Sequence, residues 1–345
     1  MKRLLAFGII SLTLLTAVSC NDQPTAPGAP RMTPLQGTLA AVMQVQDRHT
    51  AQLLRVSGVV GTATALDASG RPVIVVLTRS PGATGIPAVL ENVPVAVRVT
   101  GEFQVLSTTL AAAPKKRRTS LTSLIRPAPN GVSVGNNFEC AAGTLGTGLI
   151  IGGQRYVLSN NHVFARQNGA ALGEVIVQPG RFDSKPQCAD QTPASQLGTL
   201  ADFQVIDFSG GNNTIDAAIA APTTAITCAT PAGFYGSPGT TVVDATVGLP
   251  IQKVGRTTAR TTGSVAMINA TVTVNYGGGR LATFVGQVVT TPGMSGAGDS
   301  GSLIVTNDAA ANPVALLFAG SGDGTTIGNP IGAVLSRFNA AICHV

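Results

Sequence analysis

Short apolar runs separated by turn residues fill the chain downstream of residue 130. Thr, Val and Gly are abundant in this part, and Gly, Asn, Pro or Asp separates most of the runs. Many short strands in succession predict a mainly β fold built from barrels or a sandwich. The expected strands are Thr144–Ile151, Tyr156–Ser159, Val175–Gln178, Asp216–Ala221, Ile251–Val254, Gly263–Ile268, Ala270–Asn275, Leu281–Thr290, Gly301–Val305 and Val314–Gly320.

Residues 35–110 carry a different pattern, which begins with apolar residues at helical spacing. Leu35, Leu39 and Val42 recur every three or four positions. This spacing predicts an amphipathic helix over residues 35–57. Strands at Val59–Ala65, Pro72–Leu77 and Val93–Thr100 are expected to follow, with a short helix at Ile86–Glu91. The order αββαβ predicts a small α+β domain, and this domain contains no catalytic motif.

The N-terminal segment 1–20 is typical of an export signal. Two basic residues precede an apolar run, Leu4–Val18, which is too short to span a bilayer. Residues 21–34 are rich in Pro, Ala and Thr and are expected to form a disordered tether. The residues around Cys20 resemble a lipoprotein cleavage site. Two outcomes stay open: lipidation of Cys20, which would attach the protein to a membrane, or plain cleavage. Both place the mature protein outside the cytoplasm.

Residues 111–130 are expected to link the two parts of the chain. They contain several prolines and the basic run Lys115–Arg118. A solvated hinge is the simpler interpretation of this run. A processing site for another protease is the alternative, and cleavage there would make residues 35–110 a propeptide or folding aid.

The charge of the chain excludes a nucleic-acid-binding surface. The formal net charge is +6. Two of these charges lie in the signal segment and four in Lys115–Arg118, so the rest of the chain balances to zero. No Cys or His spacing is typical of zinc, and the Gly-rich run Gly143–Gly148 lacks the Lys-Ser/Thr ending of a nucleotide loop. We therefore expect no metal, organic cofactor or nucleic acid. The sequence leaves the oligomeric state open.

Four cysteines follow the signal segment: Cys140, Cys188, Cys228 and Cys343. An even number in an exported protein favours two disulfides, for which three connectivities exist. Proximity in sequence favours the pairs Cys140–Cys188 and Cys228–Cys343.

Three motifs carry candidate chemistry, in the chain order His162, Asp216, Ser300. His162 follows two asparagines at the end of an expected strand, and Asp216 precedes a run of Ala and Ile. Ser300 lies in the tetrad Gly298-Asp299-Ser300-Gly301.

These residue types fit nucleophilic catalysis. A serine hydroxyl is a weak nucleophile and needs a base such as His162 to take its proton. A buried carboxylate, here Asp216, fixes the tautomer of the imidazole and stabilises its charged form. The backbone N–H groups of Gly298 and Ser300 would stabilise the negative charge that develops on the attacked carbonyl oxygen.

Each of these residues has rivals of the same type elsewhere in the chain. The other histidines are expected to be solvated or capping residues, and the other serines lack the flanking Gly-Asp and Gly. Asp216 is favoured because the apolar run after it would bury its carboxylate. The rivals are His49, His344, Asp202, Asp207, Ser295 and Ser302.

Residues 128–345 resemble trypsin-like serine peptidases of the chymotrypsin fold. Gly146–Ile151 and Arg155–Ser159 look like the hairpin that delivers the histidine in that family, and the order of the three motifs is also the family's. Val254–Thr258 and Phe284–Gln287 resemble a bacterial branch related to the plant narrow-leaf type proteins.

The resemblance implies a chymotrypsin-like double β-barrel over residues 131–345. His162 and Asp216 would come from the first barrel and Ser300 from the second. In such peptidases the aspartate at position 299 can pair with a newly freed amino terminus, or it braces the turn. The substrate-binding residues implied are Met294 at the floor of the primary pocket and Phe318, Ala319 and Gly320 along the edge that pairs with substrate. This pocket suggests small or medium apolar side chains.

Together these features predict an exported serine endopeptidase that hydrolyses protein or peptide substrates. The alternative is a latent or vestigial peptidase-fold protein that binds or scaffolds in the cell envelope. It is motivated by the additional N-terminal domain and by the absence of a legible activation sequence before Gly131. An esterase is a third alternative, because the same triad cleaves esters.

Overall fold

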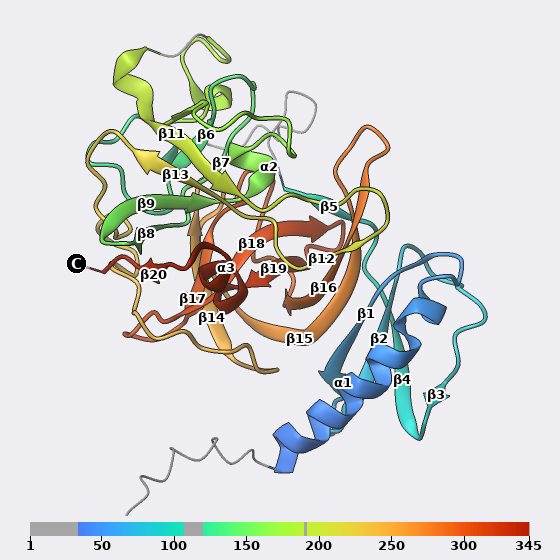
Figure 1. Cartoon of the computed structure of the whole chain (residues 1–345). Helices are drawn as coiled ribbons and strands as arrows, with labels where there is room; N and C mark the ends of the chain where they lie inside the picture. The colour runs from blue at the N-terminus through green and yellow to red at the C-terminus, as the bar shows by residue number, and fades with distance from the viewer. Residues whose placement is uncertain (1–33, 107–119, 190–191, 345) are drawn as a thin grey trace, which may run out of the picture.

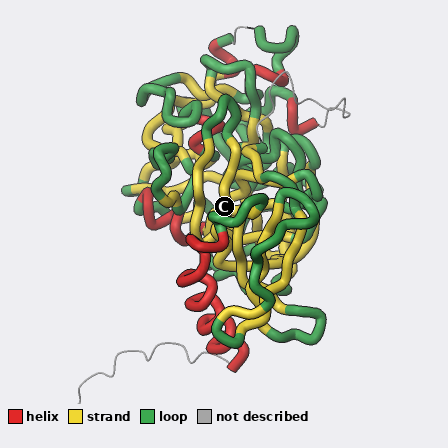
Figure 2. The backbone as a smooth tube through the Cα atoms, turned by 90° about the vertical axis from the view of Figure 1, so that its right-hand side faces the viewer, coloured by secondary structure: helices red, strands yellow, loops and turns green. Residues whose placement is uncertain are grey.

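The structure, a computed structural model, describes residues 34–106, 120–189 and 192–344. The predicted signal peptide, nearly all of the predicted tether and the run Lys115–Arg118 lie outside the described residues. Figures 1 and 2 show three units in a row, with a curled sheet at one end and the longest helix at the other. Within the described ranges, no helix is long and apolar enough to cross a membrane.

An eight-stranded curled sheet forms the first barrel, in the order β20-β8-β9-β13-β11-β10-β6-β7. Alternate residues of β13 enter different cores: Ala218 and Ala220 face one cluster and Ile219 faces another, as the period of a strand requires. The strands are β6 (Ser133–Asn136), β7 (Gly143–Thr144), β8 (Thr147–Ile151), β9 (Gln154–Ser159), β10 (Val175–Val177), β11 (Gln196–Phe203), β13 (Ala218–Pro222) and β20 (Ala341–Ile342). The short helices here are η1 (Ser120–Thr122), α2 (Asn161–Phe164), η2 (Arg181–Asp183) and η3 (Pro193–Ser195).

Six strands close into the second barrel, because β14, β15, β16, β19, β18 and β17 pair in turn and β17 returns to β14. Their bounds are β14 (Pro250–Gly255), β15 (Ala259–Asn275), β16 (Leu281–Thr290), β17 (Leu303–Thr306), β18 (Pro313–Ser321) and β19 (Thr326–Pro330). The two-residue strand β12 (Asn212–Asn213) pairs with β16, and helix α3 (Ile331–Phe338) follows β19. The predicted mainly β double-barrel fold is confirmed.

Strand β15 is one 17-residue strand where two separate strands were expected. The polar Asn269 that interrupts the apolar pattern has a positive φ of 52°. The register with β16 shifts on both sides of it, between Met267 and Ala270 and again before Val272. A bulge therefore bends the strand at this point without ending it.

The N-terminal unit consists of α1 (Pro34–Leu53), β1 (Val59–Leu66), β2 (Pro72–Thr78), β3 (Val89–Leu90) and β4 (Val93–Val99). Helix α1 packs on the sheet where Val42 and Val45 meet the fully buried Ile74. Strand β1 pairs with β2 on one side and with β15 on the other. The sheet of this unit is therefore continuous with the second barrel.

The helix predicted at Ile86–Glu91 is wrong. This segment contains β3, which pairs with the start of β4 across a two-residue turn. Glu91 and Asn92 both have positive φ, 45° and 65°, the conformation that a tight hairpin turn requires. Pro87 also lacks the N–H that a helix interior needs.

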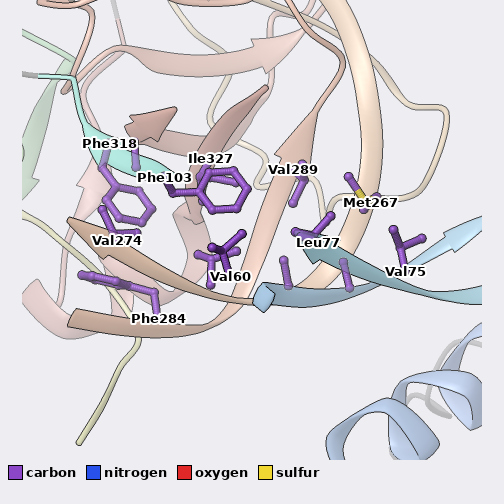
Figure 3. Close-up of a cluster of buried hydrophobic side chains, with 14 of the residues drawn as sticks. Val60, Val75, Leu77, Phe103, Met267, Val274, Phe284, Val289, Phe318 and Ile327 are labelled. Carbon is purple, nitrogen blue, oxygen red and sulfur yellow. The ribbon is translucent and has the colours of Figure 1, made fainter. Parts of the chain in front are cut away.

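Strand β5 (Phe103–Val105) leaves the N-terminal unit and joins the second barrel. It runs parallel to β15 and antiparallel to β18. Phe103 is fully buried in an apolar cluster of the second barrel and the N-terminal unit, together with Phe284 and Phe318 (Figure 3). Burying a side chain of this size contributes about 1.5–3 kcal/mol, so β5 is held firmly at its first residue.

Covalent and ionic links hold the barrels and their loops. The structure pairs Cys140 with Cys188 and Cys228 with Cys343, the pairs that sequence proximity favours. Nε and a terminal nitrogen of Arg256, in the second barrel, bind the Asp183 carboxylate of the first at 2.8 and 2.5 Å. Both side chains are almost completely buried.

Candidate active site

His162 and Asp216 form a buried pair at the edge of the first barrel. Strand β9 ends at Ser159 and α2 begins two residues later, which places His162 in its first turn. Asp216 lies just before β13, which pairs with β9. Nδ1 of His162 is 2.6 Å from Oδ2 of Asp216, and neither side chain is exposed to solvent. This geometry fixes the imidazole with its Nδ1 on the carboxylate.

Two further hydrogen bonds fix the carboxylate of Asp216. The phenol of Tyr276 donates to Oδ2 at 2.8 Å, and the backbone N–H of His162 donates to Oδ1 at 3.2 Å. The backbone N–H of Asp216 donates to Asn329 Oδ1 at 3.0 Å. Burial, followed by the Asp216 charge, raises the pKa of Tyr276 well above its usual value. The phenol therefore stays protonated and remains a donor.

Ser300 lies on the loop between β16 and β17, in the second barrel. Gly298 and Gly301 flank it with φ of 97° and 93°, a conformation that favours glycine. A Cβ at Gly301 would lie 2.2 Å from both Ser159 Oγ and Thr144 O, so the first barrel also leaves no room for a side chain there. The Ser300 carbonyl accepts a 2.7 Å bond from the N–H of Thr144. These contacts seat the serine loop against the barrel that carries His162.

The hydroxyl of Ser300 is not bonded to the imidazole in this structure. It donates instead to the carbonyl of Phe318 at 3.0 Å. Within the described residues, Nε2 of His162 is buried without a hydrogen-bond partner. Ser300 therefore differs from the expected arrangement, in which its hydroxyl donates to His162.

The end of the N-terminal unit occupies the edge predicted to pair with substrate. In β5, Val105 is opposite Ala319 and Gln104 is opposite Gly320. The N–H of Leu106 donates to the carbonyl of Phe318 at 3.3 Å. The N–H of Gly298, a predicted oxyanion donor, donates to the carbonyl of Leu106 at 2.5 Å.

The predicted pocket residues contribute in different ways. Met294 is fully buried in an apolar cluster, and Leu106 packs against this cluster. Phe318 presents only its carbonyl, because its ring lies in the core at 4.7 Å from the ring of Phe284. A Cβ at Gly320 would lie 3.1 Å from the tip of Leu106, so the absence of a side chain there leaves space for the leucine.

Asp299, which lies between the two predicted oxyanion donors, is anchored by a buried lysine. Nζ of Lys253 is 3.1 Å from Oδ2 of Asp299, and both side chains are fully buried. The Thr258 hydroxyl donates to the same oxygen at 2.6 Å, and Gly296 N–H donates to it at 2.9 Å. Burial raises the pKa of Asp299, but the Lys253 charge and these donors outweigh it, and the net pKa is lowered. Asp299 is thus a charged brace of the serine loop.

The rival residues all have partners away from His162 and Ser300. His49 bonds to Glu91, and His344 bonds to the 237–238 turn. Asp202 bonds to Arg337, and Asp207 bonds within its own loop. Ser295 bonds to Thr326, and Ser302 bonds to the Asp299 carbonyl.

Sequence reasoning missed three residues that touch this site. Tyr276 is one of only three tyrosines, and it directly follows the expected strand Ala270–Asn275. Lys253 is the single charged residue of the expected strand Ile251–Val254, which was an available signal of a buried ion pair. Leu106 carries no local signal, because its position depends on pairing with β18 more than 200 residues away.

No group of three His, Cys, Asp or Glu side chains within the described ranges is arranged to hold a metal ion.

Comparison with known proteins gives matches to solved structures, whereas no family model and no curated protein matches the chain. A glutamic acid-specific serine protease is 22% identical with a TM-score of 0.46, and the match covers 63% of this chain and 100% of that one. Protease A of Thermobifida fusca is 20% identical with a TM-score of 0.43, over 63% of this chain and 100% of its own. A chymotrypsin of Cellulomonas bogoriensis is 18% identical with a TM-score of 0.44, over 63% and 99% of the two chains.

Proposed function

We propose that this chain is a serine endopeptidase that acts through His162, Asp216 and Ser300. The observation that carries the proposal is the buried His162–Asp216 pair, with a 2.6 Å contact, beside a serine loop whose N–H donor at Gly298 already binds a peptide carbonyl. A peptide chain on the edge of β18 supports peptides as the substrate class. The assignment to a bacterial branch of the trypsin-like clan stays a prediction.

In this proposal each residue of the site has a defined role. Asp216 holds a proton on Nδ1 of His162, which leaves Nε2 free to act as the base. The Ser300 hydroxyl then attacks the substrate carbonyl as its proton passes to Nε2. The N–H groups of Gly298 and Ser300 stabilise the resulting oxyanion, and His162 returns the proton to the leaving amine. Ala319 and Gly320 pair with the substrate backbone, and Met294 lies at the pocket.

The proposed place of action is outside the cytoplasm. Two disulfides are typical of proteins in oxidising compartments, and segment 1–20 has the pattern of an export signal. Lipidation at Cys20 and plain cleavage remain the two proposed fates of that segment.

Labelling with a fluorophosphonate probe tests the proposed activity. The chain is produced with its own export segment, in two forms: unchanged and as Leu106→Asp, in which the carboxylate disfavours seating of β5 in the apolar pocket. We expect at least the Leu106→Asp form to label, and labelling to be lost when Ser300→Ala or His162→Ala is added. If both forms are folded and neither is labelled, the proposal is contradicted and the latent binding protein is favoured.

A further inference from the structure

We propose that residues 103–106 are the first substrate of this protein and that the chain cleaves its own Leu106–Ser107 bond. In other substrates it prefers, before the scissile bond, leucine or another apolar residue whose side chain does not branch at Cβ. The inference rests on the proposed function and adds to it a cleavage site, a substrate class and a mode of self-blockage.

The backbone of this segment makes the contacts that a bound substrate needs. It runs antiparallel to β18, with Val105 and Gln104 opposite Ala319 and Gly320. The Leu106 N–H and carbonyl are both engaged, the first by Phe318 O at 3.3 Å and the second by Gly298 N–H at 2.5 Å. A strand added to a free sheet edge is a common mode of peptide recognition. Here, in addition, the carbonyl on the proposed oxyanion donor identifies Leu106 as the residue that would be attacked.

The side chain of Leu106 indicates the specificity. It packs against a buried cluster that includes Met294, Val265 and Ile251. A Cβ added at Gly320 would lie 3.1 Å from a terminal methyl of Leu106, so the pocket fits leucine closely at this point. The described members of this cluster are all apolar side chains, which offer no hydrogen-bonding or charged partner. A charged residue before the scissile bond would therefore lose its hydration without gaining a partner.

The N-terminal unit holds the segment in place before any reaction. Phe103 is fully buried, three residues before Leu106. Arg98 binds Asp323 at 3.2 Å, on the loop between β18 and β19, and β1 pairs with β15. Such tethering replaces a bimolecular encounter by an intramolecular one, which raises the effective concentration of the substrate strand. Cleavage is therefore expected to follow first-order kinetics.

The step uses only groups of this chain and one water. The Ser300 hydroxyl turns from Phe318 O to His162 Nε2, and its oxygen bonds to the Leu106 carbonyl carbon as its proton moves to the imidazole. The C–N bond to Ser107 then breaks, and the imidazolium gives that proton to the Ser107 nitrogen. Water hydrolyses the Leu106 ester in the same way. The products are a Leu106 carboxylate, a Ser107 amine and free Ser300.

The first experiment follows the intact mass of the purified chain and the N-terminus of its fragments over time. We expect a new N-terminus at Ser107 in the unchanged chain, and none in Ser300→Ala. The rate is expected to stay constant over a 100-fold range of protein concentration. A rate that rises in proportion to concentration would overturn cleavage within one chain.

The second experiment tests the specificity with matched variants at one position. Leu106→Met keeps an apolar, unbranched side chain and is expected to be cleaved within a few-fold of the original rate. Leu106→Asp is expected to be slower by on the order of 100-fold. Peptides that present Leu or Asp before the scissile bond, incubated with the Leu106→Asp form, are expected to show the same preference.

The outcomes separate the two proposals. Fluorophosphonate labelling that needs Ser300, together with an intact Leu106–Ser107 bond in the unchanged chain, would refute self-cleavage and leave the peptidase proposal standing. Equal cleavage of Leu106→Met and Leu106→Asp would refute the specificity. Absence of labelling in every folded form would instead refute the peptidase proposal itself.

Discussion

Two buried carboxylates belong to the candidate site, one at each barrel, and they have different partners. Asp216, at the first barrel, faces the imidazole of His162 at 2.6 Å and the phenol of Tyr276 at 2.8 Å. Asp299, in the second barrel, faces the ammonium of Lys253 at 3.1 Å and accepts from three backbone N–H groups and one hydroxyl.

The difference indicates a division of labour. Histidine gains and loses a proton near neutral pH, so a carboxylate fixed to it can support proton transfer. Lysine keeps its charge in that range when it is paired, so the second carboxylate has no proton to move and can only fix the backbone around it. In the proposed peptidase, one pair therefore serves the chemistry, and the other serves the shape of the serine loop.

Asp216→Asn should have the largest effect and tests the first half of this division. An amide in place of the carboxylate favours the wrong tautomer of His162 and no longer stabilises the imidazolium. We expect kcat on a peptide substrate to fall by on the order of 10³–10⁴-fold, with little change in folding. Asp202→Asn, on the surface, is the matched control and should change nothing. Retained activity in Asp216→Asn would remove Asp216 from the proposed triad.

Lys253→Met tests the second half. Without its cation, Asp299 is a buried charge with only neutral donors, and the loop carrying Gly298 and Ser300 loses its anchor. We expect kcat per active site, counted by fluorophosphonate titration, to fall by roughly 100-fold, because misplaced oxyanion donors cost about that much. Lys253→Arg should restore most of this loss.

A purely structural role would give a different pattern for Lys253. It would lower the number of labelled sites and the melting temperature but leave kcat per labelled site unchanged. The double variant Lys253→Met, Asp299→Asn removes the unpaired charge and should recover stability without recovering kcat. Recovery of both would show that Lys253 does not position the donors.

The sequence predicts the parts of this site that have local signals. Each proposed triad member lies in a motif of a few residues. The strand before His162 and the strand after Ser300, β9 (Gln154–Ser159) and β17 (Leu303–Thr306), lie within two residues of where the apolar runs predict them. The boundaries of β16, Leu281–Thr290, agree with the expected run residue for residue. Strands with mixed polar and apolar composition, such as β11 and β19, were not expected, because their burial comes from neighbouring strands and not from their own pattern.

The partners of the triad could not be predicted in the same way. Tyr276 reaches Asp216 across 60 residues, and Lys253 reaches Asp299 across 46. Both contacts depend on the curvature of the second barrel, including the bulge at Asn269, and a bulge is set by tertiary packing. Leu106 is at the end of a strand whose register is fixed by Phe103 in the core of another unit.

Tyr276→Phe should have a smaller effect than either substitution above. It removes one donor from Oδ2 of Asp216 while the bond to His162 remains. We expect kcat to fall about tenfold with KM unchanged, in line with the loss of one hydrogen bond to a charged group. Tyr235→Phe removes another buried tyrosine hydroxyl, one that forms no hydrogen bond to Asp216, and is the control. An unchanged kcat in Tyr276→Phe, or a fall in kcat matched by Tyr235→Phe, would contradict the positioning role.

Thr258→Val should have the smallest effect, and the effect should depend on pH. The variant removes the 2.6 Å hydroxyl donor from Asp299 but keeps Lys253. The pKa of Asp299 is lowered in the folded protein, so this carboxylate contributes stability above its unfolded pKa of about 4, and the contribution is lost as the pH falls through the lower folded value. With a donor gone, the folded pKa should rise toward the unfolded value, so the contribution should be smaller and should be completely lost at a higher pH. We expect about 1–2 kcal/mol less stability at pH 7 and a difference from the unchanged protein that shrinks toward pH 2.

Thermal unfolding across pH 2–7 measures this difference in stability. Thr230→Val is the control, because the Thr230 hydroxyl bonds only to backbone atoms. A difference that is constant with pH would mean that Thr258 acts by packing, and that Lys253 alone keeps Asp299 charged.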